Sequence, residues 1–146
     1  MILNITEAAN LALHSLVFLA NHQDDWPIST ARAAAPFSAS EAHLNKVFQR
    51  LKKSGLVDSV RGPRGGFVLA REPREITLLE IFEAMDGPLP REHCLLGRQA
   101  CTLDSCIFGN LLPTIHNMVS EHFSKTTLAD LIAHDDRQGV STGGAG

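Results

Sequence analysis

The stretch from residue 38 to residue 70 constrains the fold more than any other part of the chain. Ser38 and Glu41 have the spacing of a capping box, which marks the start of a helix. The apolar residues that follow have the spacing of one helical face and are Leu44, Val47, Phe48 and Leu51. Gly55 is placed to end this helix, because glycine adopts left-handed backbone angles without strain.

Two short strands joined by a basic, glycine-rich turn follow the helix. Residues 56–60 favour one strand, residues 67–69 favour the return strand, and the turn at residues 61–66 reads RGPRGG. A helix followed by such a hairpin predicts a winged helix-turn-helix. The helix fits the major groove of DNA, and the tip of the hairpin can lie along phosphates or in the minor groove.

Positive charge is concentrated on this motif. Residues 46–74 hold eight of the thirteen lysines and arginines and only two acidic residues, so the segment carries +6 within a chain of net charge −3. Such a basic segment is typical of nucleic-acid binders. A solvated charged helix followed by an ordinary hairpin is the alternative interpretation.

Two sets of residues are predicted to contact DNA. The start of the basic helix should present side chains to base edges, and these are Ser38, Ser40, Glu41, His43 and Asn45. The other predicted contacts are basic residues, the last four of them assigned to phosphate: Lys46, Arg50, Lys52, Lys53, Arg61 and Arg64.

The flanking segments complete a mainly α fold with a small β-hairpin wing. A first helix is predicted at about residues 5–21, capped by Asn4, and a second at residues 31–35, capped by Ser29 or Thr30 and ended by Pro36. Thr77 and Glu80 form a second capping box before a helix that Gly87 ends. Trp26 is expected to pack under the first helix. Residues 1–87 are therefore assigned to the winged helix-turn-helix domain.

A long amphipathic helix is predicted at about residues 111–124, with Asn110 as its cap and Pro113 in its first turn. Because its apolar face lies outside the winged core, we expect a second copy of the helix to cover it in a homodimer. Folding back onto its own domain is the alternative. Residues 110–134 form this dimerisation region, including a short last helix capped by Thr127. Residues 135–146 are expected to be a disordered tail.

All three cysteines, Cys94, Cys101 and Cys106, lie in the loop predicted at residues 88–109. The chain has no apolar run that could span a membrane and no signal peptide, so we expect a cytoplasmic protein, in which structural disulfides are rare. Three thiolates in one loop could hold an iron–sulfur cluster, hold a structural zinc together with His93, or remain free redox-active thiols. A fourth ligand could be His93, Glu7, Asp104 or a residue of a second subunit.

From about residue 4 to residue 133 the chain resembles the Rrf (Rrf-two type) family of bacterial winged-helix regulators. The most specific matching segments are residues 59–63 (SVRGP), 65–66 (GG) and 76–78 (ITL). The resemblance implies a homodimeric regulator bound to a palindromic operator in double-stranded DNA. In many members an iron–sulfur cluster, [2Fe-2S] or [4Fe-4S], is held by three cysteines and senses iron, redox state or nitric oxide.

The sequence departs from the family around the cysteines. Their spacing is C-x6-C-x4-C, whereas the best-known members have five residues in each interval. Gly109 stands where some IscR-like members have a ligating histidine. Asn10 matches the position of a carboxylate ligand in NsrR-like members, with Glu7 one turn earlier.

These features together predict a DNA-binding repressor whose affinity is switched by a cluster on the cysteine loop, with a cluster-free thiol or zinc regulator as the alternative. An enzyme is not indicated, because no carboxylate or basic group is fixed as a catalytic partner of the cysteines and residues 61–66 lack the lysine of a P-loop. A small iron–sulfur electron carrier would have no use for the basic winged motif.

Overall fold

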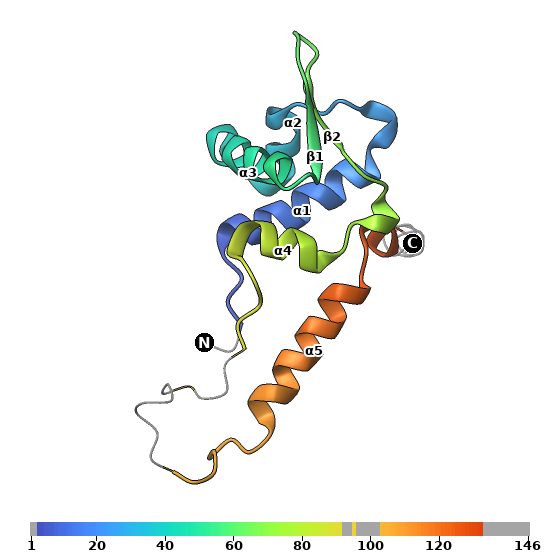
Figure 1. Ribbon diagram of the computed structural model, residues 1–146. Helices are drawn as coiled ribbons and strands as arrows, with labels where there is room; N and C mark the ends of the chain where they lie inside the picture. The colour runs from blue at the N-terminus through green and yellow to red at the C-terminus, as the bar shows by residue number, and fades with distance from the viewer. Residues whose placement is uncertain (1–2, 92–94, 96–102, 133–146) are drawn as a thin grey trace, which may run out of the picture.

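The computed structural model describes residues 3–91, 95 and 103–132 (Figure 1). Its elements are α1 (Glu7–Asn21), η1 (Gln23–Asp25), α2 (Thr30–Ala34), η2 (Ala35–Phe37), α3 (Glu41–Lys53), β1 (Val57–Val60), β2 (Gly66–Leu69), η3 (Pro73–Glu75), α4 (Leu78–Asp86) and α5 (Leu111–Lys125). A short helix follows α5 and is described from residue 128 to residue 132. The predicted fold class, mainly helical with one hairpin, is confirmed.

The hairpin projects from the helices as a wing (Figure 1). β1 and β2 pair in antiparallel register, with Val57 opposite Leu69 and Val60 opposite Gly66. Ile28 and Phe67 form an antiparallel bridge, in which each amide donates to the other residue's carbonyl with N to O distances of 3.0 and 2.8 Å. This bridge connects the base of the wing to the segment between α1 and α2. A Cβ at Gly66 would lie 2.2 Å from the Ile28 oxygen, so this close approach requires glycine.

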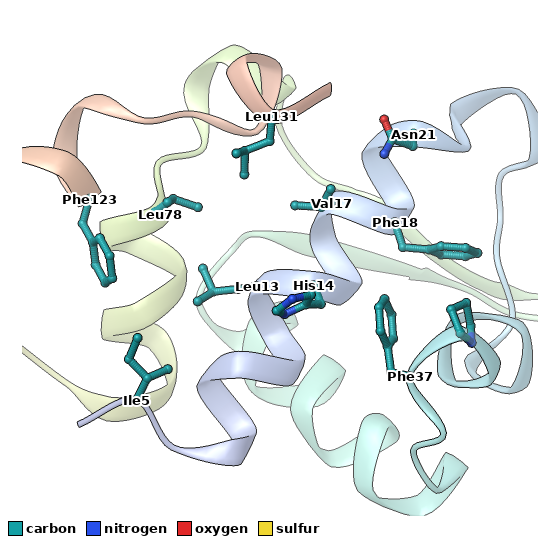
Figure 2. A pocket seen from close by; sticks show the side chains of 11 residues that line it. Ile5, Leu13, His14, Val17, Phe18, Asn21, Phe37, Leu78, Phe123 and Leu131 are labelled. Carbon is teal, nitrogen blue, oxygen red and sulfur yellow. The ribbon is translucent and has the colours of Figure 1, made fainter. Parts of the chain in front are cut away.

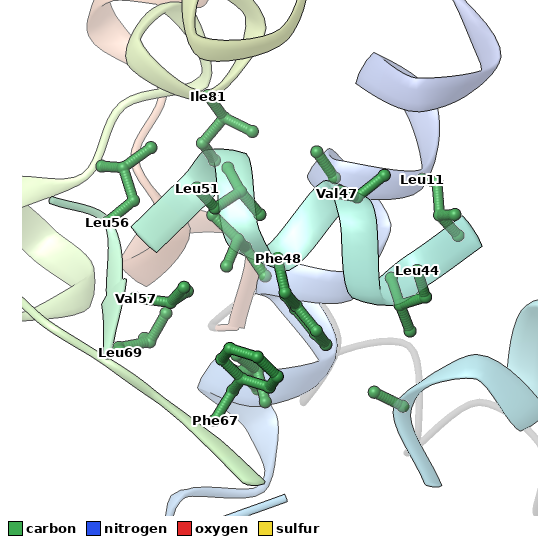
Figure 3. Packing of buried hydrophobic residues seen from close by; sticks show 14 of the residues in the cluster. Leu11, Leu44, Val47, Phe48, Leu51, Leu56, Val57, Phe67, Leu69 and Ile81 are labelled. Atoms are coloured by element: carbon green, nitrogen blue, oxygen red, sulfur yellow. The ribbon is translucent and has the colours of Figure 1, made fainter. Parts of the chain in front are cut away.

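The core is built on α1, which packs against α2, α3 and α4. The apolar face of α3 is fully buried and consists of Leu44, Val47, Phe48 and Leu51. Phe48 stacks on Phe67 of the wing at 4.5 Å between ring centroids (Figure 3). Trp26 is partly buried and donates its indole N–H to the Leu19 carbonyl at 2.9 Å, which confirms its packing against the first helix.

Two predicted helix starts are wrong by two residues. α1 is capped by Thr6, whose hydroxyl accepts from the Ala9 amide at 3.1 Å, and not by Asn4. α3 is capped by Ser40, whose hydroxyl accepts from the His43 amide at 3.1 Å. Ser38 instead ends η2 with a left-handed φ of 51°, because the chain continues as a 3-10 turn through Pro36 after α2.

Three other predicted helix ends agree with the structure, whereas Asn110 precedes α5 without a side-chain capping hydrogen bond. Ser29 caps α2, and Gly55 and Gly87 follow α3 and α4 with a φ of 76°. The Thr77–Glu80 capping box is formed in both directions, since each side chain accepts from the other residue's amide at 3.2 Å.

The long helix α5 contacts its own domain, as the alternative interpretation predicts. Phe123 packs edge-on against Phe82 of α4 at 5.7 Å, and Leu112 is buried. The chain after α5 then pairs with the start of α4, because Leu78 donates to the Thr126 carbonyl and Leu128 donates to the Ile76 carbonyl, both at 3.0 Å.

Glu80, in the first turn of α4, makes the stability of the fold depend on pH. Burial raises the pKa of its carboxyl, but hydrogen bonds from Arg71 at 2.9 Å and from the Thr77 amide outweigh this and hold the pKa below the usual 4.5. A depressed carboxyl pKa contributes stability above the unfolded-state value, and this contribution is lost as the pH falls through the lower folded value.

We therefore expect Glu80→Gln to lower the free energy of unfolding at pH 7 by about 1 kcal/mol or less, since the side chain is 41% exposed. The difference from the wild type should shrink as the pH falls below 4.5. Denaturant titrations at several pH values measure it. Glu83→Gln, on the exposed side of the same helix, is the control, and an equal, pH-independent loss in both variants would contradict the assignment.

Candidate nucleic-acid interface

The outer face of α3 is polar and solvent-exposed. Its buried face fixes the roll of the helix, so that Glu41, Asn45 and Lys46 point away from the core. His43 is half-buried, and its Nδ1 lies 4.0 Å from a Glu7 carboxylate oxygen. Ser38 and Ser40 are also exposed, although the Ser40 hydroxyl is engaged in capping α3. We refer to α3 as the recognition helix.

The tip of the wing presents two exposed guanidinium groups, those of Arg61 and Arg64. The turn between them is closed by a hydrogen bond from the Gly65 amide to the Gly62 carbonyl at 2.9 Å. A Cβ at Gly65 would lie 2.2 Å from the Val60 oxygen. The glycines therefore allow a turn tight enough to carry both arginines at its end.

Two of the predicted DNA contacts are bound within the protein. The Lys52 ammonium donates to the Ser59 hydroxyl at 2.6 Å and links the end of α3 to β1. Arg50 Nη2 donates to the Met85 carbonyl at 2.5 Å and to the Ala84 carbonyl at 3.4 Å, at the end of α4. Lys46 and Lys53 are exposed and have no hydrogen-bond partner within the described part of the chain.

Of the cysteines only Cys106 is described. Its side chain is half-buried, and its carbonyl accepts from the Gly109 amide at 3.0 Å just before α5. Cys94, Cys101 and His93 lie outside the described residues. Asp104 is exposed, and Glu7 lies beside His43. Within residues 3–91, 95 and 103–132, no group of three histidine, cysteine or acidic side chains could hold a metal ion.

An apolar groove of about 690 Å³ lies along α1, and the sequence did not predict it (Figure 2). Leu13, Val17 and Phe18 of α1 line it together with Phe37 of η2 and Phe123 of α5. His14 is exposed and also lines this groove, and its Nδ1 lies within hydrogen-bond distance, 2.8 Å, of the Asn10 carbonyl oxygen. The apolar residues of α1 were visible in the sequence, but their partners come from distant segments.

The comparisons with known proteins agree with this geometry. The model of the Rrf2 family, described as an iron-dependent transcriptional regulator, matches residues 5–134. The chain belongs to the Rrf2 family.

Similar Rrf2 proteins include both IscR and a cysteine regulator. The chain is 29% identical to the HTH-type transcriptional regulator IscR of Yersinia enterocolitica, over 92% of this chain and 82% of the relative. The solved structure of CymR (YrzC), the global cysteine regulator of B. subtilis, has 30% identity and a TM-score of 0.77, covering 90% of this chain and 98% of that one. The structure of IscR from T. potens has 26% identity and a TM-score of 0.73, covering 98% and 94%.

These similarities support a regulator of transcription that binds DNA, and the relatives that they name are regulators rather than enzymes. No helix in the described part of the chain is long and apolar enough to cross a membrane.

The two arginines of the wing tip lead to a prediction about the salt dependence of DNA affinity. If Arg61 and Arg64 contact phosphate, the double variant Arg61→Ala/Arg64→Ala should bind all DNA sequences more weakly. The slope of log affinity against log salt should fall by about two, or about one for each lost contact. Arg74→Ala/Arg91→Ala removes the same charge away from the wing tip and is the control. An unchanged slope in the wing variant would exclude contact with the backbone.

The recognition helix makes a prediction about base preference. Asn45→Ala and His43→Ala should relax the preference at particular base pairs, because a bidentate side-chain contact discriminates by about 1–3 kcal/mol. Binding to an operator selected from random DNA, and to its single-base variants, measures the effect. Gln49→Ala, exposed on the next turn of α3, is the control. Equal losses for operator and random DNA would show that these side chains do not read bases.

Proposed function

We propose that this Rrf2 protein is a homodimeric repressor that binds a palindromic operator, and that an iron–sulfur cluster on Cys94, Cys101 and Cys106 sets its DNA affinity. The observation that carries the proposal is the arrangement of the DNA-binding motif. An exposed polar face on α3 and a basic wing tip belong to one domain, and the cysteine loop leaves that domain at the end of α4.

The DNA-binding part of the proposal follows from shape and charge. The recognition helix enters the major groove with the residues of its first turns toward base edges. The wing lies against the backbone, where Arg61 and Arg64 neutralise phosphates. The hydrogen bond from Lys52 to Ser59 holds the wing to the end of the helix, so both contacts are made in one fixed geometry.

Dimerisation is supported by apolar surface that the single chain leaves open. On α5, Leu111 is 49% exposed and Met118 is 67% exposed, and the groove along α1 is lined by apolar side chains. A two-fold dimer through α5 would bury such surface twice. It would also allow two recognition helices to lie about 34–36 Å apart in successive turns of DNA.

The cysteine loop has the donor chemistry that an iron–sulfur cluster requires. Three thiolates, from Cys94, Cys101 and Cys106, would hold iron, and the fourth ligand would be His93, Glu7, Asp104 or a group of the second subunit. A bound cluster supplies a centre whose charge and integrity change with iron supply, oxidants or nitric oxide. The loop connects α4 to α5, so its residues would transmit such a change to the angle between the DNA-binding domain and the dimer axis.

A cluster-free regulator is the second candidate. It is favoured by the similarity to CymR, which is described as a cysteine regulator, and by the x6 and x4 spacing of the cysteines. In that case the cysteines act as redox-active thiols or hold zinc, and the DNA-binding function is unchanged.

We expect Cys94→Ala, Cys101→Ala and Cys106→Ala each to abolish the visible absorbance of anaerobically purified protein and to share one DNA-binding phenotype. A coupling of about 1–3 kcal/mol corresponds to roughly 5–150-fold in operator affinity. The apolar stripe of α5 contains no cysteine, so sedimentation should show an unchanged dimer.

A colourless wild-type protein would favour the cluster-free candidate. Three variants that bind the operator as the wild type does would show that the cysteine loop is not the switch.

A further inference from the structure

The last turn of α4 contacts the recognition helix and the start of α1, and it leads directly into the loop before α5. Helix C-termini carry carbonyls without intrahelical partners and a partial negative charge, so they attract cations. Arg50 supplies both hydrogen-bond donors and a positive charge at the end of α4. Its Nη2 donates to the Met85 carbonyl at 2.5 Å and to the Ala84 carbonyl at 3.4 Å. These hydrogen bonds are charge-assisted and connect the last turn of the recognition helix to the last turn of α4.

The same turn of α4 also binds the start of α1. The Thr6 amide donates to one Asp86 carboxylate oxygen at 3.1 Å, and the Thr6 hydroxyl donates to the other at 2.5 Å. One residue later, Gly87 ends the helix with a φ of 76° and the loop of residues 88–109 begins.

The start of this loop is in turn connected to α5. His116 Nδ1 lies 3.1 Å from the Pro90 carbonyl oxygen, a distance at which a ring N–H donates to it. A continuous path of contacts therefore runs from α5 through Pro90 and Gly87 to the Met85 carbonyl, and from there through Arg50 to the recognition helix.

We infer that Arg50 is a positioning residue, which fixes the recognition helix against the end of α4 and passes changes of the loop and α5 to it, and is not a contact to DNA. The part of this inference that concerns switching rests on the proposed function. The part that concerns positioning does not, because it depends only on the bonds between Arg50 and α4.

The neighbouring Lys53 provides a matched control. It lies in the same last turn of α3 and carries the same charge, and both residues are exposed. Unlike Arg50, Lys53 has no hydrogen-bond partner within the residues described. A cation that contacts phosphate contributes about one unit to the salt slope, whereas a cation that binds protein carbonyls in place of phosphate contributes none.

The test measures operator affinity against salt for the wild type, Arg50→Gln and Lys53→Gln, each with and without Cys106→Ala. Arg50→Gln should lower operator affinity without changing the salt slope, and Lys53→Gln should lower the slope by about one. In each background, the operator affinity with intact cysteines is divided by the affinity of the Cys106→Ala form. This ratio should fall toward one in Arg50→Gln and should keep its wild-type value in Lys53→Gln.

A salt slope that falls by about one in Arg50→Gln would overturn the positioning role, whether or not the cysteines switch binding. An affinity ratio retained in Arg50→Gln would overturn the coupling role. If the wild-type ratio is already one, the proposed switch fails and the slope alone decides the role of Arg50.

A measurement on the wild type covers the case in which Arg50→Gln does not fold. Guanidinium NMR resonances of Arg50 should stay unchanged when the protein binds its operator, whereas those of Arg61 and Arg64 should shift. A shift of the Arg50 resonances as large as that of the wing arginines would contradict the inference.

Discussion

The geometry of the DNA-binding surface depends on the burial of one face of α3. Leu44, Phe48 and Leu51 are completely buried, and burying each such side chain contributes about 1.5–3 kcal/mol. Since these residues fix the roll of the helix, they also determine that Asn45 and Lys46 face outward. The stacking of Phe48 on Phe67 extends the same core into the wing, so the hairpin and the helix are oriented by one set of apolar contacts (Figure 3).

Periodicity and turn chemistry in the sequence predicted most of this arrangement. The apolar spacing of α3, the glycines of the wing and the Thr77–Glu80 capping box all specify local structure, and the structure forms each of them. The caps of α1 and α3 were predicted at Asn4 and Ser38, but Thr6 and Ser40, each two residues later, form them. Spacing alone does not show that the 3-10 turn after α2 uses Ser38 as its end.

Contacts between distant residues could not be predicted in the same way. Arg50 was assigned to DNA because it lies on a basic helix, yet its partners are backbone carbonyls 34 and 35 positions away. No local sequence pattern predicts which side chain will bind the carbonyls at a helix end. The same holds for a groove whose walls come from α1, η2 and α5. The ligand set of the cysteine loop stays a prediction, since Cys94, Cys101 and His93 lie outside the described residues.

The attachment of α5 suggests how the loop before it would act on the domain in the proposed switch. Its C-terminal end is fixed to the start of α4 by main-chain hydrogen bonds at Thr126 and Leu128, whereas its N-terminal end follows the loop. A helix of 15 residues is about 22 Å long, so a tilt of about 10° around the fixed end moves the other end by about 4 Å. In the proposed dimer that displacement occurs on both sides of the two-fold axis. Because the two recognition helices of such a dimer must match a repeat of about 34–36 Å, the proposed switch would need only a small change in the loop to alter DNA affinity.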